Sequence, residues 1–332
     1  MARFGATILD ATGQRLSADE KALFRDANPF GFILFARNID TADQVRALCD
    51  EMRAAVGHDA LITIDQEGGR VQRLRDPLAT EWMPPLDFVH AAGAQAEKAM
   101  YLRYRLIAAE LRALGVDSNC APMVDLASEA THAFLRNRCY GEDPQTVARL
   151  GRAVAKGHLD GGVLPVLKHM PGHGRSLIDS HYDLPRVAAP LNDLRTSDFA
   201  PFKALNDLPL GMTAHQVFEA IDTAPATLSA ATIRLIRDEI GFDGLIMTDD
   251  ISMKALSGTP AEIARAALGA GCDVVLHCNA SLLDRIAVAD AAGEMTAAAQ
   301  TRAEAALGAR RHPEPLDIGA ARTQLQRLFD TA

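Results

Sequence analysis

The chain contains 332 residues, of which 48% are hydrophobic and 23% are charged. This composition is typical of a globular protein with a large core, and the length suits a single barrel of roughly 250 residues with additions. Acidic residues outnumber basic ones by 43 to 34, which gives a net charge of -9 and argues against nucleic-acid binding, because that binding needs a basic face. The five cysteines are scattered without a CxxC pair, so neither a disulfide framework nor a cysteine zinc site is expected.

The sequence contains no segment expected to enter a membrane. No uninterrupted apolar run approaches the ~18 residues that a membrane span requires. The N-terminal segment MARFGATILDATG has an acid at Asp10 and no apolar core of the length found in signal peptides. We therefore expect a cytoplasmic protein.

Short apolar runs alternate with helix-like segments along the chain. An early run covers residues 5–10, and seven others cover residues 31–35, 60–65, 116–122, 163–169, 210–215, 244–250 and 272–278. Helical periodicity lies between them, at residues 42–57, 96–115, 143–162, 229–241 and 261–271. Strands that alternate with helices predict parallel βα units. Because the runs are apolar almost throughout, their strands are expected to be buried on both faces.

Polar residues follow or end several of these runs, which decides between two architectures. They are Asp65, Lys168, His169, His215, Asp249 and Asp250. In a barrel the C-terminal ends of the strands converge on one mouth, whereas in an open sheet they spread along an edge. We therefore predict an α/β protein with a (β/α)8 TIM-type barrel, in which the early run is an eighth strand or a cap. One domain is expected over residues 1–332, with a C-terminal helical tail at about 281–332.

The stretch KHMPGHGRSLIDSHYDLP, residues 168–185, concentrates ionisable side chains after a predicted strand. Lys168 and His169 end that strand, so both can point into the mouth. Asp179 and His181 are close enough in sequence for the carboxylate to hold the imidazole, which fixes the tautomer and raises the histidine pKa. A histidine with a pKa near the working pH is suited to general acid and base catalysis.

Two further segments bring acids and arginines to the same end of the predicted barrel. In DQEGGRVQR, Asp65 would accept hydrogen bonds from sugar-like hydroxyls while Arg70 or Arg73 orients the ligand. In FLRNRCYGEDP, Arg136 and Arg138 follow the third of the later runs, where they either reach the ligand or pair with nearby acids.

The run at 244–250 ends in two adjacent carboxylates, Asp249 and Asp250. Neighbouring residues of a strand face opposite ways, so one of the two is expected in the mouth while the other pairs locally or caps the next turn. A carboxylate there could act as a metal ligand, a base or a nucleophile.

These groups together fit two-step glycoside hydrolysis, in which a carboxylate attacks the anomeric carbon and a proton donor assists the leaving oxygen. A metal-dependent hydrolase on the same barrel is an alternative. Its candidate zinc ligands are His169, His173, His181, His215 and Asp249. A non-catalytic barrel that binds a sugar or nucleotide is a second alternative.

The motifs DQEGGRVQR, KHMPGHG, DSH and TDDISM, in this order between Phe30 and Cys278, resemble glycoside hydrolase family 3. They are most similar to its bacterial β-N-acetylglucosaminidase branch, which is active in cell-wall recycling. The resemblance implies that Asp249 is the nucleophile, His181 the acid/base and Asp179 its partner. It also implies substrate binding by Asp65, Arg73, Arg138, Lys168 and His169.

The resemblance further implies a substrate of the muropeptide type, N-acetylglucosamine joined β-1,4 to 1,6-anhydro-N-acetylmuramic acid, with or without peptide. It implies a cytoplasmic enzyme without a metal or organic cofactor. We also expect a monomer. Action on another β-glycoside, or phosphorolysis in place of hydrolysis, stays open. The sequence departs from the family pattern in two places, at the arginine loop LRNRCYG and at Met170, where Phe is usual.

Overall fold

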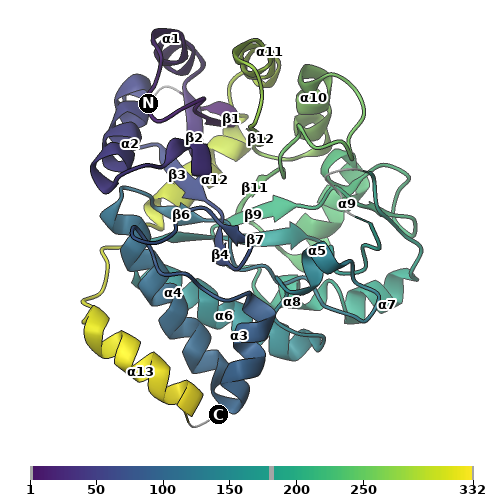
Figure 1. Ribbon diagram of the computed structural model, residues 1–332. Coiled ribbons are helices and arrows are strands. Elements are labelled where there is room, and N and C mark those ends of the chain that lie inside the picture. Colours follow the sequence, from purple (N-terminus) through teal and green to yellow (C-terminus); the bar gives the residue numbers. More distant parts are fainter. Residues whose placement is uncertain (1–2, 179–182, 331–332) are drawn as a thin grey trace.

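Parallel strands form the centre of the computed structural model, which describes residues 3–178 and 183–330, and helices surround them (Figure 1). Two four-stranded sheets carry the orders β12-β1-β2-β3 and β11-β9-β7-β6. Their strands are β1 (Gly5–Asp10), β2 (Pro29–Leu34), β3 (Leu61–Ile64), β6 (Ser118–Asn119), β7 (Leu164–Met170), β9 (Leu210–Thr213), β11 (Leu245–Met247) and β12 (Val275–His277). Two small sheets lie outside this set, formed by β4 (Gln66–Gly68) with β5 (Val71–Gln72) and by β8 (Arg186–Val187) with β10 (Val217–Phe218).

Backbone hydrogen bonds connect the two main sheets at both seams. The Asp117 amide donates to the Ile62 carbonyl at 3.1 Å beside β3 and β6, and the Thr248 amide donates to the Val274 carbonyl at 3.1 Å beside β11 and β12. The predicted (β/α)8 TIM-type barrel is therefore confirmed, with short interruptions of the ladder at the seams. The early run is β1, which pairs with β12 and β2 and is therefore a barrel strand rather than a cap. Of the predicted strands, the one at 116–122 is the least regular, because only Ser118–Asn119 (β6) form a strand there.

The strands are buried on both faces, as their apolar runs predict. One hydrophobic cluster fills the barrel interior and includes Ile8, Leu61, Val166, Leu210, Leu245 and Val274. Alternate residues of the same strands face the helices in a second cluster, which includes Leu9, Phe32, Ile62, Leu167, Ile246 and Val275. Because side chains alternate along a strand, one run of apolar residues supplies both layers.

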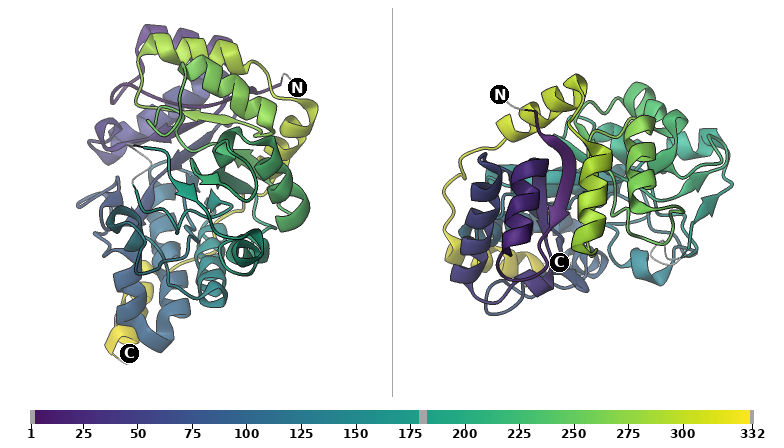
Figure 2. Two further views of the ribbon diagram at one scale, coloured as in Figure 1. Left: turned by 90° about the vertical axis from the view of Figure 1, so that its right-hand side faces the viewer. Right: turned by 90° about the horizontal axis from the view of Figure 1, so that it is seen from above.

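Helices cover the outside of the strands (Figures 1 and 2). The longer ones are α1 (Ala18–Ala27), α2 (Ala42–Val56), α4 (Ala96–Ala113), α6 (Pro144–Asp160), α10 (Pro260–Ala270) and α11 (Leu282–Ala292). The shorter ones are α3 (Pro85–Ala92), α5 (Ala133–Arg136), α7 (Leu191–Thr196), α8 (Ala200–Ala204) and α9 (Ala230–Leu235). The segment predicted as one helix at 229–241 is α9 followed by a π-helical turn, η4 (Ile236–Ile240). None of the helices in the described ranges is both long enough and apolar enough to cross a membrane.

Local sequence sets the ends of several helices. Ser17 and Thr259 form capping boxes with Glu20 and Glu262, which satisfy backbone amides at the starts of α1 and α10. Gly57 ends α2 at a φ of 71°, a left-handed conformation that disfavours other residues.

The described part of the predicted C-terminal tail contains three helices, α11, α12 and α13, which pack against different parts of the barrel. The first, α11, packs beside α1, α10 and β1 in the outer layer of the barrel. The second, α12 (Ala297–Gly308), buries Ala299, Ala303 and Ala306 in the interior cluster, beside the residues near the start of β7, β9 and β11. The third, α13 (Ile318–Asp330), packs on α4 and α3, away from the strands (Figures 1 and 2). The segment therefore closes the N-terminal end of the barrel with α12 and extends its outer layer with α11 and α13.

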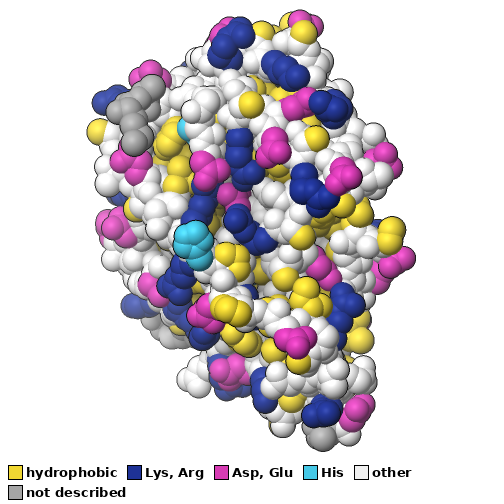
Figure 3. Space-filling model, turned by 90° about the vertical axis from the view of Figure 1, so that its left-hand side faces the viewer, with side chains coloured by type: hydrophobic (Ala, Val, Ile, Leu, Met, Phe, Trp, Pro, Cys, Tyr) yellow, Lys and Arg dark blue, Asp and Glu magenta, His cyan; other side chains and the backbone are white. Residues whose placement is uncertain are grey.

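Charged side chains of both signs lie close together on the face drawn in Figure 3.

Arg310, which precedes α13, pairs with Asp59, which follows α2, at 2.7 Å, and it also pairs with Asp117 at 3.0 Å. These ion pairs tie the connection between α12 and α13 to the barrel.

The packing of α12 can be tested with the substitution Ala303→Leu. Ala303 is fully buried, so the larger side chain should overpack the closed end and lower the free energy of unfolding by about 1–3 kcal/mol. Ala305→Leu, an exposed position on the same helix, should change it by less than ~0.5 kcal/mol. Urea unfolding of the two variants measures the difference, and equal stability would contradict a packed barrel end.

Candidate active site

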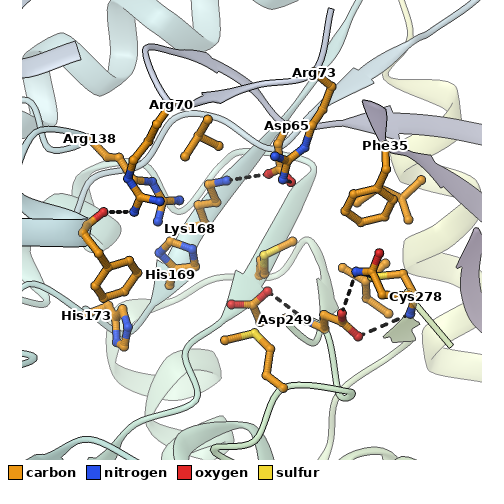
Figure 4. A pocket seen from close by; sticks show the side chains of 18 residues that line it. Phe35, Asp65, Arg70, Arg73, Arg138, Lys168, His169, His173, Asp249 and Cys278 are labelled. Atoms are coloured by element: carbon orange, nitrogen blue, oxygen red, sulfur yellow. Dashed lines mark hydrogen bonds and ion pairs between the residues drawn. The ribbon is translucent and has the colours of Figure 1, made fainter. Parts of the chain in front are cut away.

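A cavity of ≈ 250 Å³ lies at the C-terminal ends of the barrel strands (Figure 4). Six of the eight predicted site residues line it: Asp65, Arg73, Arg138, Lys168, His169 and Asp249. The other two, Asp179 and His181, lie outside the described residues. The apolar residues that line the cavity include Phe35, Phe134, Met212, Met253 and Leu276. Residues far apart in the sequence, such as Asp65 and Asp249, which are 184 positions apart, are thus brought to one mouth.

Asp65 follows β3 and holds two cationic side chains. Its Oδ1 lies 3.0 Å from Lys168 Nζ, and its Oδ2 lies 2.9 Å from Arg73 Nη2. Burial favours the neutral acid, but the charges of Lys168 and Arg73 outweigh it and hold the pKa of Asp65 well below its ordinary value. Asp65 is therefore an ionised acceptor whose remaining lone pairs can bind hydroxyl groups.

The hairpin β4–β5 positions Arg73. Gln66 Oε1 accepts hydrogen bonds from the Arg73 and Leu74 amides, both at 3.0 Å, which fixes the backbone that carries the guanidinium. In this hairpin Gly68 has a φ of 111°, and a Cβ at this position would lie 2.0 Å from Arg103 Nη2. The glycine therefore allows the hairpin to pack against the protein interior.

Glu67 is a site residue that sequence reasoning missed. It is 1% exposed, and its Oε1 lies 2.6 Å from Lys168 Nζ. Its two carboxylate oxygens also accept hydrogen bonds from Arg138, with Nε at 2.9 Å and Nη2 at 2.7 Å. Burial raises the pKa of Glu67, yet Arg138 and Lys168 lower it to about 2 overall. The sequence offered one signal for Glu67, its position two residues after Asp65. Its partners could not be inferred, because Arg138 and Lys168 lie far away in the sequence.

Asp125 is a second missed residue, and it holds His169. The fully buried Asp125 accepts a hydrogen bond from His169 Nδ1 at 2.7 Å and one from the His173 amide at 2.6 Å. With Nδ1 bonded to the carboxylate, the ring orientation of His169 is fixed, and Nε2 remains as its other polar atom. Figure 4 shows His169 near Lys168 and Arg138, with His173 on the other side of His169.

Asp249 and Asp250 both line the cavity but have different surroundings. Asp250 accepts hydrogen bonds from the Ser252 amide at 2.9 Å and the Ser252 hydroxyl at 2.7 Å, so it caps the following turn. Asp249 accepts one from the Asp250 amide at 2.8 Å. Burial raises the pKa of Asp249, but His169 and His215 outweigh burial and lower it below its ordinary value. The partly exposed Asp249 is thus the carboxylate available for a ligand.

Arg70 and Phe134 also line the cavity. The Arg70 guanidinium donates to the Phe134 carbonyl and lies 5.4 Å from the centre of the Phe134 ring. Arg136, the other arginine of that loop, pairs with Glu142 at 3.7 Å and does not line the cavity.

Two of the histidines proposed as zinc ligands, His215 and His169, use ring nitrogens in other hydrogen bonds. His215 uses Nδ1 with the Thr227 hydroxyl at 2.8 Å and Nε2 with the Asp250 carbonyl at 3.0 Å, and His169 uses Nδ1 with Asp125. Among the described residues, no three His, Cys, Asp or Glu side chains are grouped so that they could hold a metal ion.

Residues 6–306 match the family model for the glycosyl hydrolase family 3 N terminal domain. The chain belongs to glycoside hydrolase family 3. The β-hexosaminidase of Thiobacillus denitrificans is 38% identical over 284 residues, which cover 83% of this chain and 78% of that protein. The β-hexosaminidase of Alkalilimnicola ehrlichii is also 38% identical over 284 residues, covering 83% of this chain and 81% of that protein.

Solved structures of the same family superpose on nearly the whole chain. NagZ from Neisseria gonorrhoeae, in complex with N-trifluoroacetyl-D-glucosamine, has a TM-score of 0.81 and 30% identity, covering 98% of both chains. A family 3 β-N-acetylglucosaminidase from Paenibacillus has a TM-score of 0.85 and 30% identity, covering 98% of this chain and 67% of that one. The predicted family and enzyme class, a glycoside hydrolase of the β-N-acetylhexosaminidase type, are confirmed by these comparisons.

The role of Asp125 can be tested with Asp125→Asn. An amide cannot provide the charged acceptor for His169 Nδ1, so kcat/KM should fall by about 10- to 100-fold. Steady-state hydrolysis of an aryl β-N-acetylglucosaminide measures the effect. The control is Asp273→Asn, because Asp273 is also buried but pairs with Arg237 and Arg302 elsewhere. An unchanged kcat/KM in Asp125→Asn would contradict the assignment.

Proposed function

We propose that the enzyme removes a terminal N-acetylglucosamine from peptidoglycan fragments, with retention of the anomeric configuration. In this proposal the substrate is N-acetylglucosamine joined to 1,6-anhydro-N-acetylmuramic acid, with or without peptide. The ligand in the Neisseria NagZ structure, N-trifluoroacetyl-D-glucosamine, supports recognition of an N-acetylated sugar. The enzyme would act as a cytoplasmic monomer, and none of the steps below requires a metal or organic cofactor.

The observation that carries the proposal is the arrangement of one ionised carboxylate beside a ring of hydroxyl-binding groups. Asp249 lies in the same cavity as Asp65, Lys168 and Arg138. Asp65 can accept from sugar hydroxyls, and Lys168 and Arg138 can donate to them. A sugar held by these groups would have its anomeric carbon presented to Asp249.

In the proposed reaction, a carboxylate oxygen of Asp249 bonds to the anomeric carbon while the glycosidic C–O bond breaks. His181, oriented by Asp179, donates a proton to the leaving oxygen. In the second step His181 takes a proton from water, whose oxygen displaces Asp249 from the sugar. The lowered pKa of Asp249 supports its role, because only the ionised carboxylate is a nucleophile.

Asp249→Asn should abolish turnover, by at least about 1,000-fold, because the amide cannot form the glycosyl intermediate. Asp250→Asn is the matched control and should lose much less activity, since Asp250 bonds to Ser252 in the turn. Rates with an aryl β-N-acetylglucosaminide and the anomeric configuration of the first product, followed by NMR, test the proposal together. Inverted product, or equal losses in the two variants, would refute it.

His181→Ala should reduce activity on a disaccharide from peptidoglycan far more than on a substrate with a good leaving group. Proton donation matters less when the leaving oxygen is already a weak base. The measurement is kcat/KM for the disaccharide and for a nitrophenyl glycoside in the same variant. Equal losses on the two substrates would argue against His181 as the proton donor.

A further inference from the structure

Glu67 does not line the cavity, although it bonds to two residues that do. Lys168 and Arg138 line the cavity wall, and Glu67 lies behind them at 1% exposure. Its main-chain carbonyl accepts a hydrogen bond from the Tyr104 hydroxyl at 3.3 Å, and the Arg103 guanidinium also bonds to it, at 2.5 Å. Because its backbone is held from the helical layer, the Glu67 carboxylate is a fixed acceptor in the interior.

The hydrogen-bonding capacity of Lys168 shows what Glu67 does to its ammonium group. An ammonium has three N–H donors. Lys168 donates one hydrogen bond to Asp65 Oδ1 at 3.0 Å, and its Nζ forms an ion pair with Glu67 Oε1 at 2.6 Å. The two carboxylates therefore hold the ammonium between them, which limits the directions in which it can donate to a ligand.

The same count applies to Arg138. The guanidinium has five N–H donors, and Glu67 binds it through Nε and Nη2 at 2.9 and 2.7 Å. A two-point contact fixes the plane of the guanidinium. Because Arg138 lines the cavity (Figure 4), the donors that Glu67 does not use can bind a ligand there.

The balance of charge also indicates that Glu67 holds Lys168 and Arg138 in place. Lys168, Arg138 and Arg73 bring three positive charges to one buried group, against which Asp65 supplies one negative charge. Glu67 supplies the second negative charge. Without it, Lys168 and Arg138 would lose a shared counter-ion and would no longer be drawn together.

We propose that Glu67 is a positioning residue that sets the donor geometry for sugar hydroxyls by holding Lys168 and Arg138 at once. This inference rests on the proposed function of the cavity, since it assigns these donors to the sugar. It implies that Glu67 affects substrate binding more than the chemical step, and that it keeps Lys168 protonated at high pH.

The test compares Glu67→Gln and Glu67→Asp with the unmodified enzyme on an aryl β-N-acetylglucosaminide across pH. Glu67→Gln should raise KM by about 10- to 100-fold with a smaller change in kcat, because the charged hydrogen bonds from Arg138 and the ion pair with Lys168 are lost. Burial lowers the pKa of Lys168, but Asp65 and Glu67 outweigh burial and raise it above its ordinary value. Removal of the Glu67 charge should lower that pKa, so the rise of KM at alkaline pH should begin at a lower pH.

Glu67→Asp keeps the charge but shortens the side chain. It should raise KM while leaving the alkaline limb close to that of the unmodified enzyme, and it provides the test if Glu67→Gln does not fold. The matched control is Glu20→Gln. Glu20 is also buried and pairs with a buried arginine, Arg285, at 3.0 Å, but Arg285, unlike Lys168 and Arg138, does not line the cavity. Glu20→Gln should lower thermal stability without changing KM or its pH dependence.

The outcomes separate the inference from the proposed function. Absence of hydrolysis by the unmodified enzyme would overturn the function itself. If that enzyme is active and Glu67→Gln changes only thermal stability, as Glu20→Gln does, Glu67 has no positioning role. If Glu67→Gln lowered kcat by about 10- to 100-fold and left KM unchanged, the inference would also be overturned.

Discussion

The geometry of the cavity depends on the contact of Lys168 with the carboxylates of Asp65 and Glu67. This contact joins the end of β7 to the segment that follows β3, and Arg138 connects the loop after α5 to the same group. Removing charges from water is costly, and a buried ion pair often stabilises a fold no more than apolar residues of the same size would. Folding alone therefore does not explain the group. Recognition of a hydroxyl-rich ligand does, because fixed donors and ionised acceptors lie at one surface.

The N-terminal end of the barrel contributes to stability, and the C-terminal end carries the active-site residues. At the N-terminal end, apolar residues of the strands pack together and α12 covers them with alanines, which bring the helix close. At the C-terminal end, the same strands lead into the charged residues of the cavity. The free energy gained by apolar burial at one end offsets the desolvation of charged groups at the other. This is the division expected for barrel enzymes, whose active sites lie at the C-terminal face.

Much of this arrangement can be predicted from the sequence, because strand periodicity and strand ends are local features. Asp65, Lys168 and Asp249 each follow or end an apolar run, and a barrel brings such ends together whatever their separation. Glu67 and Asp125 could not be found in this way. Their roles come from partners between 44 and 101 residues away, such as His169 for Asp125 and Lys168 for Glu67. The π-helical turn after α9 was not predicted, and the strand predicted at 116–122 is found, but only over the two residues of β6.

The electrostatics of the described cavity bear on where a proton donor can come from. Asp65 and Asp249 both have pKa values lowered by neighbouring cations, so neither holds a proton near neutral pH. Burial and the neighbouring His169 lower the pKa of His173 to about 4, which makes it neutral and a poor acid. A carboxyl that served as the acid would need the opposite shift, toward a raised pKa. The surroundings that keep Asp249 ionised thus leave these three groups unsuited to protonate a leaving oxygen, and the proton donor proposed above, His181, belongs to a different segment.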